Sequence, residues 1–137
     1  MNKEPLPLTT RHKVRSYELD AYGIVNNANY LNYFEYARGD YILQKGLGLD
    51  DFTRLNTLPR VVRVTIHFKQ PAFVENVLRI DADITRWRHT SFTMHYEITN
   101  ETTNTLTAVA DMELAFVNNA GKPVAIAEEF RTAFSRK

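Results

Sequence analysis

The second half of this chain alternates apolar and polar residues in four separate segments, and that alternation constrains the fold more than any other feature. It predicts β-strands over residues 62–68, 78–85, 92–99 and 106–116. Each strand would have one apolar face, because successive side chains point to opposite sides of a sheet. Residues 11–19 alternate more loosely and suit a first strand. About five such strands predict a single antiparallel sheet.

A long helix is predicted ahead of the four regular strands, over about residues 27–45. Four of its residues fall on one stripe at spacings of four, three and four, namely Tyr30, Phe34, Ala37 and Tyr41. Leu31 and Ile42 are expected to widen this stripe, and Gly46 supplies a stop signal. One long helix and a one-faced sheet predict an α+β fold in which the sheet wraps around the helix.

The length and the terminal segments predict one domain. A chain of 137 residues is long enough for a single core. Residues 1–10 contain two prolines and are expected to form an irregular arm. Residues 118–121 are predicted to turn, and residues 127–134 to form a short closing helix.

Composition excludes several classes of function. A net charge of +1 argues against a general nucleic-acid binder, which needs a basic stripe. The absence of cysteine excludes disulfides, thiolate nucleophiles and Cys-ligated zinc. The four His residues lack ligand spacing, so no metal site is expected. No segment approaches the roughly 18 apolar residues of a membrane span or resembles a signal peptide, so a soluble cytoplasmic protein is the expectation.

The chemistry is expected just before the long helix. Asp20 and Gly23 precede a helix start whose backbone N–H groups stay exposed. The positive end of a helix favours negative charge that develops on a ligand. A carboxylate beside such donors can attack a carbonyl, or activate water against it, while the donors hold the carbonyl oxygen. The segment therefore predicts acyl-group hydrolysis.

A family resemblance covers nearly the whole chain and centres on residues 20–38, which read DAYGIVNNANYLNYFEYAR. This segment resembles the signature of the 4-hydroxybenzoyl-CoA thioesterase-like family, whose hotdog fold wraps an antiparallel sheet around one long helix. The resemblance extends to residues 70–72 and to Trp87 and Arg88 with Ser91. The run Tyr-Gly-Ile-Val-Asn-Asn is also similar to the plant acyl-lipid thioesterases, which act on fatty acyl groups held by acyl carrier protein (ACP).

The resemblance implies roles for three residues of this segment. Asp20 takes the catalytic position, as nucleophile or as general base, and both roles stay open. Its ordinary alternative is a carboxylate that caps the following turn. Asn27 matches the position whose backbone N–H polarises the thioester carbonyl, while its side chain suits a helix cap. Gly23 is expected to turn the backbone tightly enough to aim these donors.

Further residues are candidates for substrate contact. Tyr22, Tyr30 and Phe34 are expected to shape an acyl channel, with core packing as the alternative for each. Residues 86–91 resemble the segment in which family members grip the phosphates of CoA. This makes Arg88 and Ser91 candidates, because the guanidinium fork suits phosphate. The two arginines of that segment would share a strand face if the strand stayed regular.

Four other titratable residues are interpreted first as structural. Glu35 and Arg38 stand three apart on the helix and are expected to form an ordinary ion pair. Related enzymes sometimes use a mid-helix carboxylate from the partner subunit, which keeps Glu35 as a secondary candidate. His67 and His95 lie on outward faces of predicted strands and are expected to be solvated surface residues.

The leading hypothesis is a thioesterase that hydrolyses an acyl-CoA or acyl-ACP to the free acid and the thiol, without a metal or organic cofactor. The resemblance implies a homodimer or homotetramer with sites between subunits, and neither nucleic acid nor membrane as a partner. Two alternatives are a non-catalytic acyl-thioester binding protein and a hydratase or dehydratase. The latter needs a His paired with a carboxylate near the helix start, and no His lies between His12 and His67.

Overall fold

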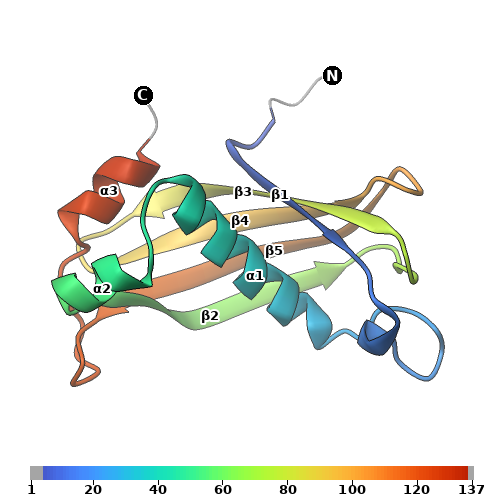
Figure 1. Ribbon diagram of the computed structural model, residues 1–137, viewed down its shortest axis with the longest axis horizontal. Coiled ribbons are helices and arrows are strands. Elements are labelled where there is room, and N and C mark those ends of the chain that lie inside the picture. Colours follow the sequence, from blue (N-terminus) through green and yellow to red (C-terminus); the bar gives the residue numbers. More distant parts are fainter. Residues whose placement is uncertain (1–4, 136–137) are drawn as a thin grey trace.

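The computed structural model describes residues 5–135, which form one antiparallel sheet with a long helix lying across one face (Figure 1). The strands are β1 (Leu8–Lys13), β2 (Leu58–Phe68), β3 (Val77–Trp87), β4 (Ser91–Asn100) and β5 (Thr105–Val117). The helices are the 3-10 turn η1 (Ser16–Glu18), α1 (Asn29–Gln44), α2 (Leu49–Leu55) and α3 (Glu128–Phe134). The strand order β1-β3-β4-β5-β2 confirms the predicted five-stranded α+β architecture.

The first strand differs from its prediction. β1 begins at Leu8 and ends at Lys13, so part of the predicted irregular arm is strand and residues 14–19 are not. The reason is pairing with β3, in which Leu8 lies opposite Ala82 and Lys13 opposite Val77. Residues 1–4 of the predicted arm lie outside the described residues.

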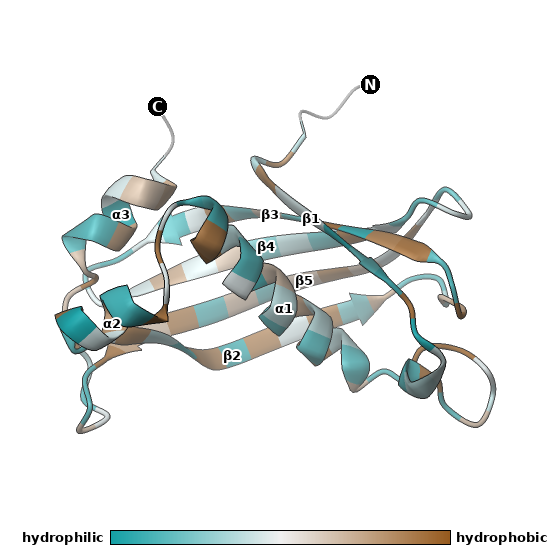
Figure 2. Cartoon of the chain, in the orientation of Figure 1, coloured by the Kyte–Doolittle hydropathy of each residue, from teal (hydrophilic) through white to brown (hydrophobic). Residues whose placement is uncertain are grey.

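The aromatic stripe of α1 faces the sheet as predicted. Tyr30, Phe34, Ala37 and Tyr41 are all at most 3% exposed. The Tyr41 hydroxyl donates to the Ile80 carbonyl, which satisfies the polar end of a buried ring. Figure 2 colours most of α1 as hydrophilic, because tyrosine and asparagine dominate its composition. Leu31 is 46% exposed, so the expectation that it widens the stripe is wrong.

The end of the sheet near α2 and α3 is closed by aromatic rings. Phe130 of α3 lies 5.1 Å from Phe92 and 5.0 Å from Phe116, measured between ring centroids. The predicted closing helix is therefore confirmed. Helix α2 was not predicted, because its seven residues bury only Phe52 and carry no extended apolar stripe.

Strand β2 forms one edge of the sheet and pairs only with β5. It begins at Leu58, four residues before the predicted start at residue 62, and therefore includes Pro59. An edge position tolerates proline because one side of the strand has no ladder bonds to lose. Among residues 5–135 no helix combines the length and apolar character needed to cross a membrane.

Candidate active site

The loop between η1 and α1 is closed at its base by backbone contacts. Leu19 forms an isolated bridge with Val25, and the Asp20 N–H donates to the Ile24 carbonyl at 2.8 Å. The Gly23 N–H donates to the Asp20 carbonyl at 3.1 Å, and Gly23 has φ +80°. This left-handed conformation explains why glycine suits the position. These contacts close a short loop, and the chain then continues directly to the start of α1.

Asp20 is half-buried and uses one carboxylate oxygen within the loop. Its Oδ1 accepts a hydrogen bond from the Tyr22 N–H at 2.8 Å, so it does cap the following turn. Within residues 5–135, Oδ2 accepts no hydrogen bond. Capping and chemistry are compatible because they need different oxygens.

The start of α1 leaves one backbone donor without a partner. The helix begins at Asn29, two residues later than predicted, and Ala28 is its N-cap. Asn26, not Asn27, supplies the side chain that accepts the Ala28 N–H, at 2.9 Å. The helix-capping interpretation of the Asn27 side chain is therefore wrong. In the described part of the chain the Asn27 N–H makes no hydrogen bond, although its carbonyl accepts the Tyr30 N–H at 3.2 Å.

The three predicted channel residues occupy different environments. Tyr22 is 90% exposed, which rules out core packing for it. Tyr30 is buried, and its ring lies 5.3 Å from that of Phe68 on β2. Burial raises the pKa of the Tyr30 hydroxyl to about 12. Phe34 is fully buried against Tyr96, so within one subunit it belongs to the core.

Arg88 and Ser91 meet in the turn between β3 and β4. The Arg88 N–H donates to the Ser91 carbonyl at 2.8 Å. Arg131 of α3 donates to the Arg88 carbonyl at 2.7 Å, and its guanidinium lies over the Trp87 ring at 5.1 Å. These contacts hold the turn through its backbone. The Arg88 side chain is exposed and forms no ion pair within residues 5–135.

The two arginines of this segment do not share a regular strand face. The pairing of β3 with β4 shifts register between Ile84 and Arg86, and β3 ends at Trp87. Arg88 therefore lies in the turn, and Arg86 lies in the irregular end of the strand. The prediction that Arg86 and Arg88 share a face required a regular strand, and the strand is not regular here. Both side chains are nevertheless exposed.

Glu35 forms the predicted ion pair with Arg38. The carboxylate is largely exposed, whereas the arginine is buried and also reaches the Met112 sulfur at 3.4 Å. His67 is exposed as expected. His95 is not a freely solvated residue, because Nδ1 lies 3.0 Å from Asp111 and Nε2 lies 2.8 Å from Glu97.

Glu18, two residues before Asp20, is the centre of a buried cluster that the sequence did not predict. It is only 7% exposed, and Oε1 accepts the Tyr33 hydroxyl at 2.7 Å and the Arg15 N–H at 3.0 Å. His12 Nε2 lies 3.0 and 3.1 Å from the two carboxylate oxygens. Burial raises the pKa of the Glu18 carboxyl, but the hydrogen bonds from Arg15, His12 and Tyr33 outweigh it and hold the pKa below its ordinary value. This carboxylate is ionised at neutral pH.

A pocket of about 390 Å³ opens on this cluster. It is lined by His12, Arg15, Tyr17, Glu18, Asn29, Asn32, Tyr33 and Tyr36. Neither Asp20 nor Asn27 lines it. His12 thus does pair with a carboxylate near the helix start, so the sequence argument against such a pair is wrong. The alternation along the chain was a signal for this pair. The side chains of Leu8, Thr10 and Val14 are buried, and His12 falls on the same face because it stands two residues from Thr10 and from Val14.

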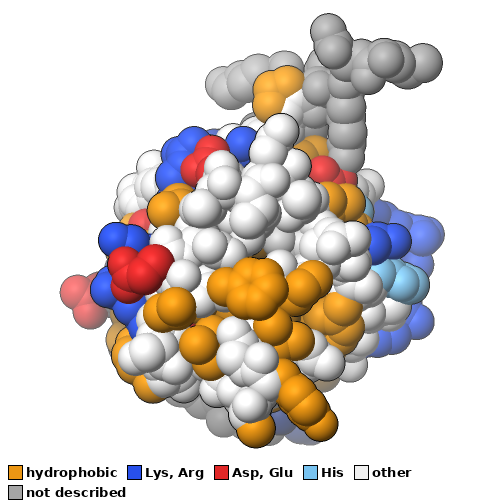
Figure 3. Space-filling model, turned by 90° about the vertical axis from the view of Figure 1, so that its right-hand side faces the viewer, with side chains coloured by type: hydrophobic (Ala, Val, Ile, Leu, Met, Phe, Trp, Pro, Cys, Tyr) orange, Lys and Arg blue, Asp and Glu red, His pale blue; other side chains and the backbone are white. Residues whose placement is uncertain are grey.

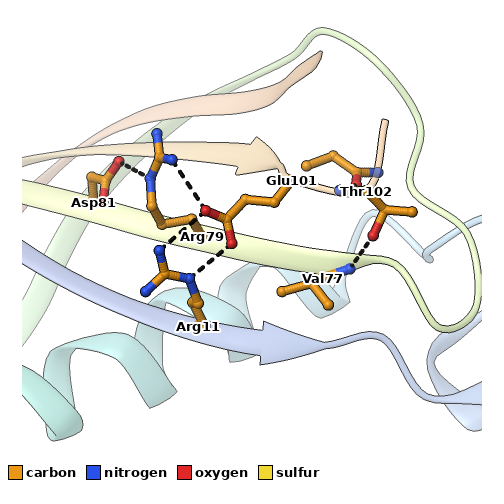
Figure 4. A network of polar contacts seen from close by, with 7 residues as sticks. Arg11, Val77, Arg79, Asp81, Glu101 and Thr102 are labelled. Atoms are coloured by element: carbon orange, nitrogen blue, oxygen red, sulfur yellow. Dashed lines mark hydrogen bonds and ion pairs between the residues drawn. The ribbon is translucent and has the colours of Figure 1, made fainter. Parts of the chain in front are cut away.

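A second polar network lies on the polar face of the sheet (Figure 4). Arg11 donates to Glu101 through Nε at 2.8 Å and Nη2 at 3.1 Å. Arg79 donates to Asp81 at 2.9 Å and to Glu101 at 3.3 Å. The Arg11 side chain is exposed and those of Arg79 and Glu101 are partly exposed, so the network lies at the surface, with Asp81 as its most covered member. Over the described range no group of three or more His, Asp or Glu could hold a metal ion.

Three known proteins are similar to this chain over part or nearly all of its length. The crystal structure of a hypothetical protein from Aquifex aeolicus superposes with a TM-score of 0.87 at 29% identity, covering 94% of this chain and all of that one. FadM of Escherichia coli strain K12, named a long-chain acyl-CoA thioesterase, is 34% identical over 110 residues, covering 80% of this chain and 81% of FadM. A chloroplastic acyl-ACP thioesterase of Arabidopsis thaliana is 37% identical over 59 residues, covering 43% of this chain and 31% of that protein.

The family model of the thioesterase-like superfamily matches residues 14–134, which include the loop, α1 and all the strands except β1. The match therefore spans both the fold and the candidate site. This chain is a hotdog-fold member of the thioesterase-like superfamily.

Proposed function

We propose that the protein hydrolyses an acyl-CoA or acyl-ACP thioester to the free acid and the thiol, with Asp20 and the Asn27 N–H as the reacting and stabilising groups. The observation that carries the proposal is the Asn27 N–H, which lies two residues before a 16-residue helix and makes no hydrogen bond within residues 5–135. The helix dipole supports negative charge at that amide. An oxyanion that forms there would meet a donor already in place.

Both roles of Asp20 fit this arrangement. As a general base, the carboxylate takes a proton from water, the hydroxide adds to the carbonyl carbon, and the thiol leaves as the C–S bond breaks. As a nucleophile, a carboxylate oxygen adds instead, and the thiolate leaves as the C–S bond breaks. Water then cleaves the resulting anhydride, which restores the Asp20 carboxylate, forms the free acid and releases the proton that the thiolate takes up. In both routes the carbonyl oxygen gains negative charge and the Asn27 N–H stabilises it.

The acyl group is proposed to lie against the end of the molecule that carries this loop. Figure 3 shows hydrophobic side chains gathered on that end. Large apolar side chains exposed on η1, the loop, the end of β2 and the segment after it are Tyr17, Tyr22, Phe68, Phe73 and Val74. Such a patch is typical of a binding surface. A homodimer that brings a second subunit over it would enclose the acyl chain, and a tetramer would pair two such dimers.

The Arg88 guanidinium, which is exposed and forms no ion pair within residues 5–135, supports CoA as the thiol carrier, since arginine binds phosphate through paired N–H groups. The E. coli relative is named for acyl-CoA and the Arabidopsis relative for acyl-ACP, so both carriers belong in the test. Replacing Arg88 by Gln is expected to raise KM for acyl-CoA about tenfold with little change in kcat, in keeping with loss of one phosphate contact.

The decisive experiment measures free thiol release from panels of acyl-CoA and acyl-ACP. Asp20→Asn is expected to lower kcat at least about a hundredfold, because it removes the base or nucleophile. Asp50→Asn is the matched control, since Asp50 is an exposed carboxylate on α2 at the other end of the molecule. Equal thiol release by wild type and Asp20→Asn would remove Asp20 from the mechanism. Thioester binding without release would instead favour a non-catalytic binding protein.

The His12–Glu18 pair is a specific observation in favour of the second candidate function, a hydratase or dehydratase. Such an enzyme would add water across the double bond of a 2-enoyl thioester, which removes the conjugated absorption without releasing thiol. The donors that already occupy Glu18 speak against this role. Loss of enoyl absorption in wild type but not in His12→Gln, with no thiol released, would establish the hydratase in place of the thioesterase.

A further inference from the structure

Glu18 joins three elements through its side chain. His12 belongs to β1, Arg15 precedes η1, and Tyr33 belongs to α1. The Arg15 N–H and the Tyr33 hydroxyl donate to the carboxylate of Glu18, and His12 Nε2 is also hydrogen-bonded to it. A buried carboxylate is costly unless its oxygens accept hydrogen bonds. Here the hydrogen bonds come from separate parts of the chain, so they form only when those parts are packed together. The cluster therefore fixes η1 between β1 and α1.

The main chain of Glu18 holds the far side of the loop. Its carbonyl accepts the Asn26 N–H at 2.9 Å and the Asn29 side-chain amide at 2.7 Å. Asn26 and Asn29 flank Asn27, and the Asn26 carbonyl also accepts the Asn29 N–H at 2.8 Å. Asn26 and Asn29, which lie on either side of Asn27, thus both donate to the Glu18 carbonyl, the first through its backbone and the second through its side chain.

The same residue sets the near side of the loop. Asp20 lies two residues after Glu18, and its N–H donates to the Ile24 carbonyl just before the chain returns to Asn26. A change in the orientation of Glu18 would therefore move Asp20 and Asn27 relative to each other. A misplacement of about 1 Å between reacting groups can cost about a hundredfold in rate.

We propose that Glu18 is a positioning residue for the thioester hydrolysis proposed above, on which this inference rests: its side chain locks η1 in place, and its carbonyl sets the distance from Asp20 to the Asn27 N–H. Glu18 does not itself exchange protons with substrate. Its oxygens are engaged by His12, Arg15 and Tyr33, and it is nine-tenths buried.

The first test compares three substitutions by kcat and KM for a thioester that the wild type hydrolyses. Glu18→Ala removes every side-chain contact and is expected to lower kcat about a hundredfold with KM within about twofold. Glu18→Gln keeps an oxygen for the Arg15 N–H and the Tyr33 hydroxyl and offers an amide to His12, so kcat should stay within about tenfold of wild type. Tyr33→Phe should fall between them.

Glu101→Gln is the matched control. Glu101 also accepts from two residues, but it lies in the surface network on the polar face of the sheet, and kcat should be unchanged. Loss of activity in Glu18→Gln as complete as in Glu18→Ala would show that the charge itself acts, which overturns the positioning role. Wild-type kcat in Glu18→Ala would overturn it as well.

Amide hydrogen exchange supplies a readout that does not depend on activity. The Asn26 N–H is expected to exchange at least about tenfold faster in Glu18→Ala than in wild type, because its acceptor carbonyl is no longer held. If Glu18→Ala fails to fold, Tyr33→Phe and Glu18→Gln give the same comparison, with accelerated exchange in the first only. Unchanged Asn26 exchange in Tyr33→Phe, together with unchanged kcat, would refute the inference.

The two proposals fail in different ways. If the wild type releases no thiol from any substrate, or Asp20→Asn is fully active, the proposed hydrolysis is wrong while the exchange data still report on the Glu18 contacts. If Asp20→Asn is inactive and Glu18→Ala is not impaired, the hydrolysis stands and the positioning role is wrong.

Discussion

One end of the sheet is closed by aromatic rings and the other by hydrogen bonds. The aromatic end centres on Phe130, whose neighbours Phe92 and Phe116 are at most 1% exposed. The polar end centres on Glu18, which accepts hydrogen bonds from three elements. The hydrophobic burial of the rings does not depend on direction, whereas a hydrogen bond weakens steeply when its angle changes. The difference implies that the aromatic end contributes more to the stability of the fold, whereas the polar end fixes the relative positions of the segments that meet at Glu18.

The largest expected effect is on stability at the aromatic end. Phe130→Ala should lower the free energy of unfolding by about 3–5 kcal/mol, because it leaves a cavity among buried rings. Urea denaturation measures the loss, and kcat of the remaining folded protein should be unchanged. Phe73→Ala is the control, since that ring is 46% exposed and should change stability by less than about 0.5 kcal/mol. A large fall in kcat with little loss of stability would reverse the assignment of the two ends.

At the polar end, Tyr33→Phe should destabilise by about 1.5–3 kcal/mol, because it removes a hydrogen bond to a buried charge. Tyr36→Phe is the matched variant on the next turn of α1. Its hydroxyl is on an exposed residue and donates to the Arg11 carbonyl at 3.3 Å. Urea denaturation of both variants sharpens the contrast, and equal losses would show that burial of Glu18 adds nothing.

Acid should weaken the polar end selectively. The pKa of Glu18 in the folded protein lies below its ordinary value of 4.5, so ionisation of this group stabilises the fold. That contribution is complete above pH 4.5 and is lost as the pH falls through the lowered pKa. The unfolding free energy of wild type minus that of Glu18→Gln should therefore be constant near neutral pH and shrink below pH 4.5. A difference that grew on acidification would mean that the donors do not outweigh burial.

The smallest expected effect lies between the two ends, on the polar face of the sheet. Burial lowers the pKa of His95, but hydrogen bonds to Glu97 and Asp111 outweigh it and raise the pKa above 6.5. Its stabilising contribution is present below pH 6.5 and disappears as the pH rises through the raised value. His95→Gln should thus cost slightly more stability at pH 6 than at pH 9. Added salt should reduce the difference, since Asp111 is exposed.

The sheet and the buried stripe of α1 were predictable because each repeats a period over many residues. Patterns of two and of 3.6 residues locate β3, β4, β5 and α1 without knowledge of any contact. β1 was misplaced because its few residues mix polar and apolar groups, so that pairing with β3 decides its bounds. The short α2 depends on one buried ring, Phe52, and has no period long enough to detect.

The candidate site was predictable only in part. The loop of Asp20, Gly23 and Asn27 is local, so a motif can identify it. The contacts of Glu18 cannot be found in that way, because His12 is six residues before it and Tyr33 is fifteen residues after it. Only the assembled helix and sheet bring these groups together. The helix cap was misassigned for a similar reason, since either of two adjacent asparagines could accept the first amide and the loop geometry selects Asn26.

Gly23 shows how little surrounds the proposed catalytic turn. Apart from its two neighbours in the chain, a methyl group added at its α-carbon would meet no atom of the described residues within 4 Å, so the positive φ is what disfavours ordinary residues. Mirror-image alanine, introduced by chemical ligation, prefers that same backbone region and would fit the open space. The positive φ of Gly23 is thus the torsion that a residue of opposite chirality would favour, and such a residue would reduce the conformational freedom of the turn.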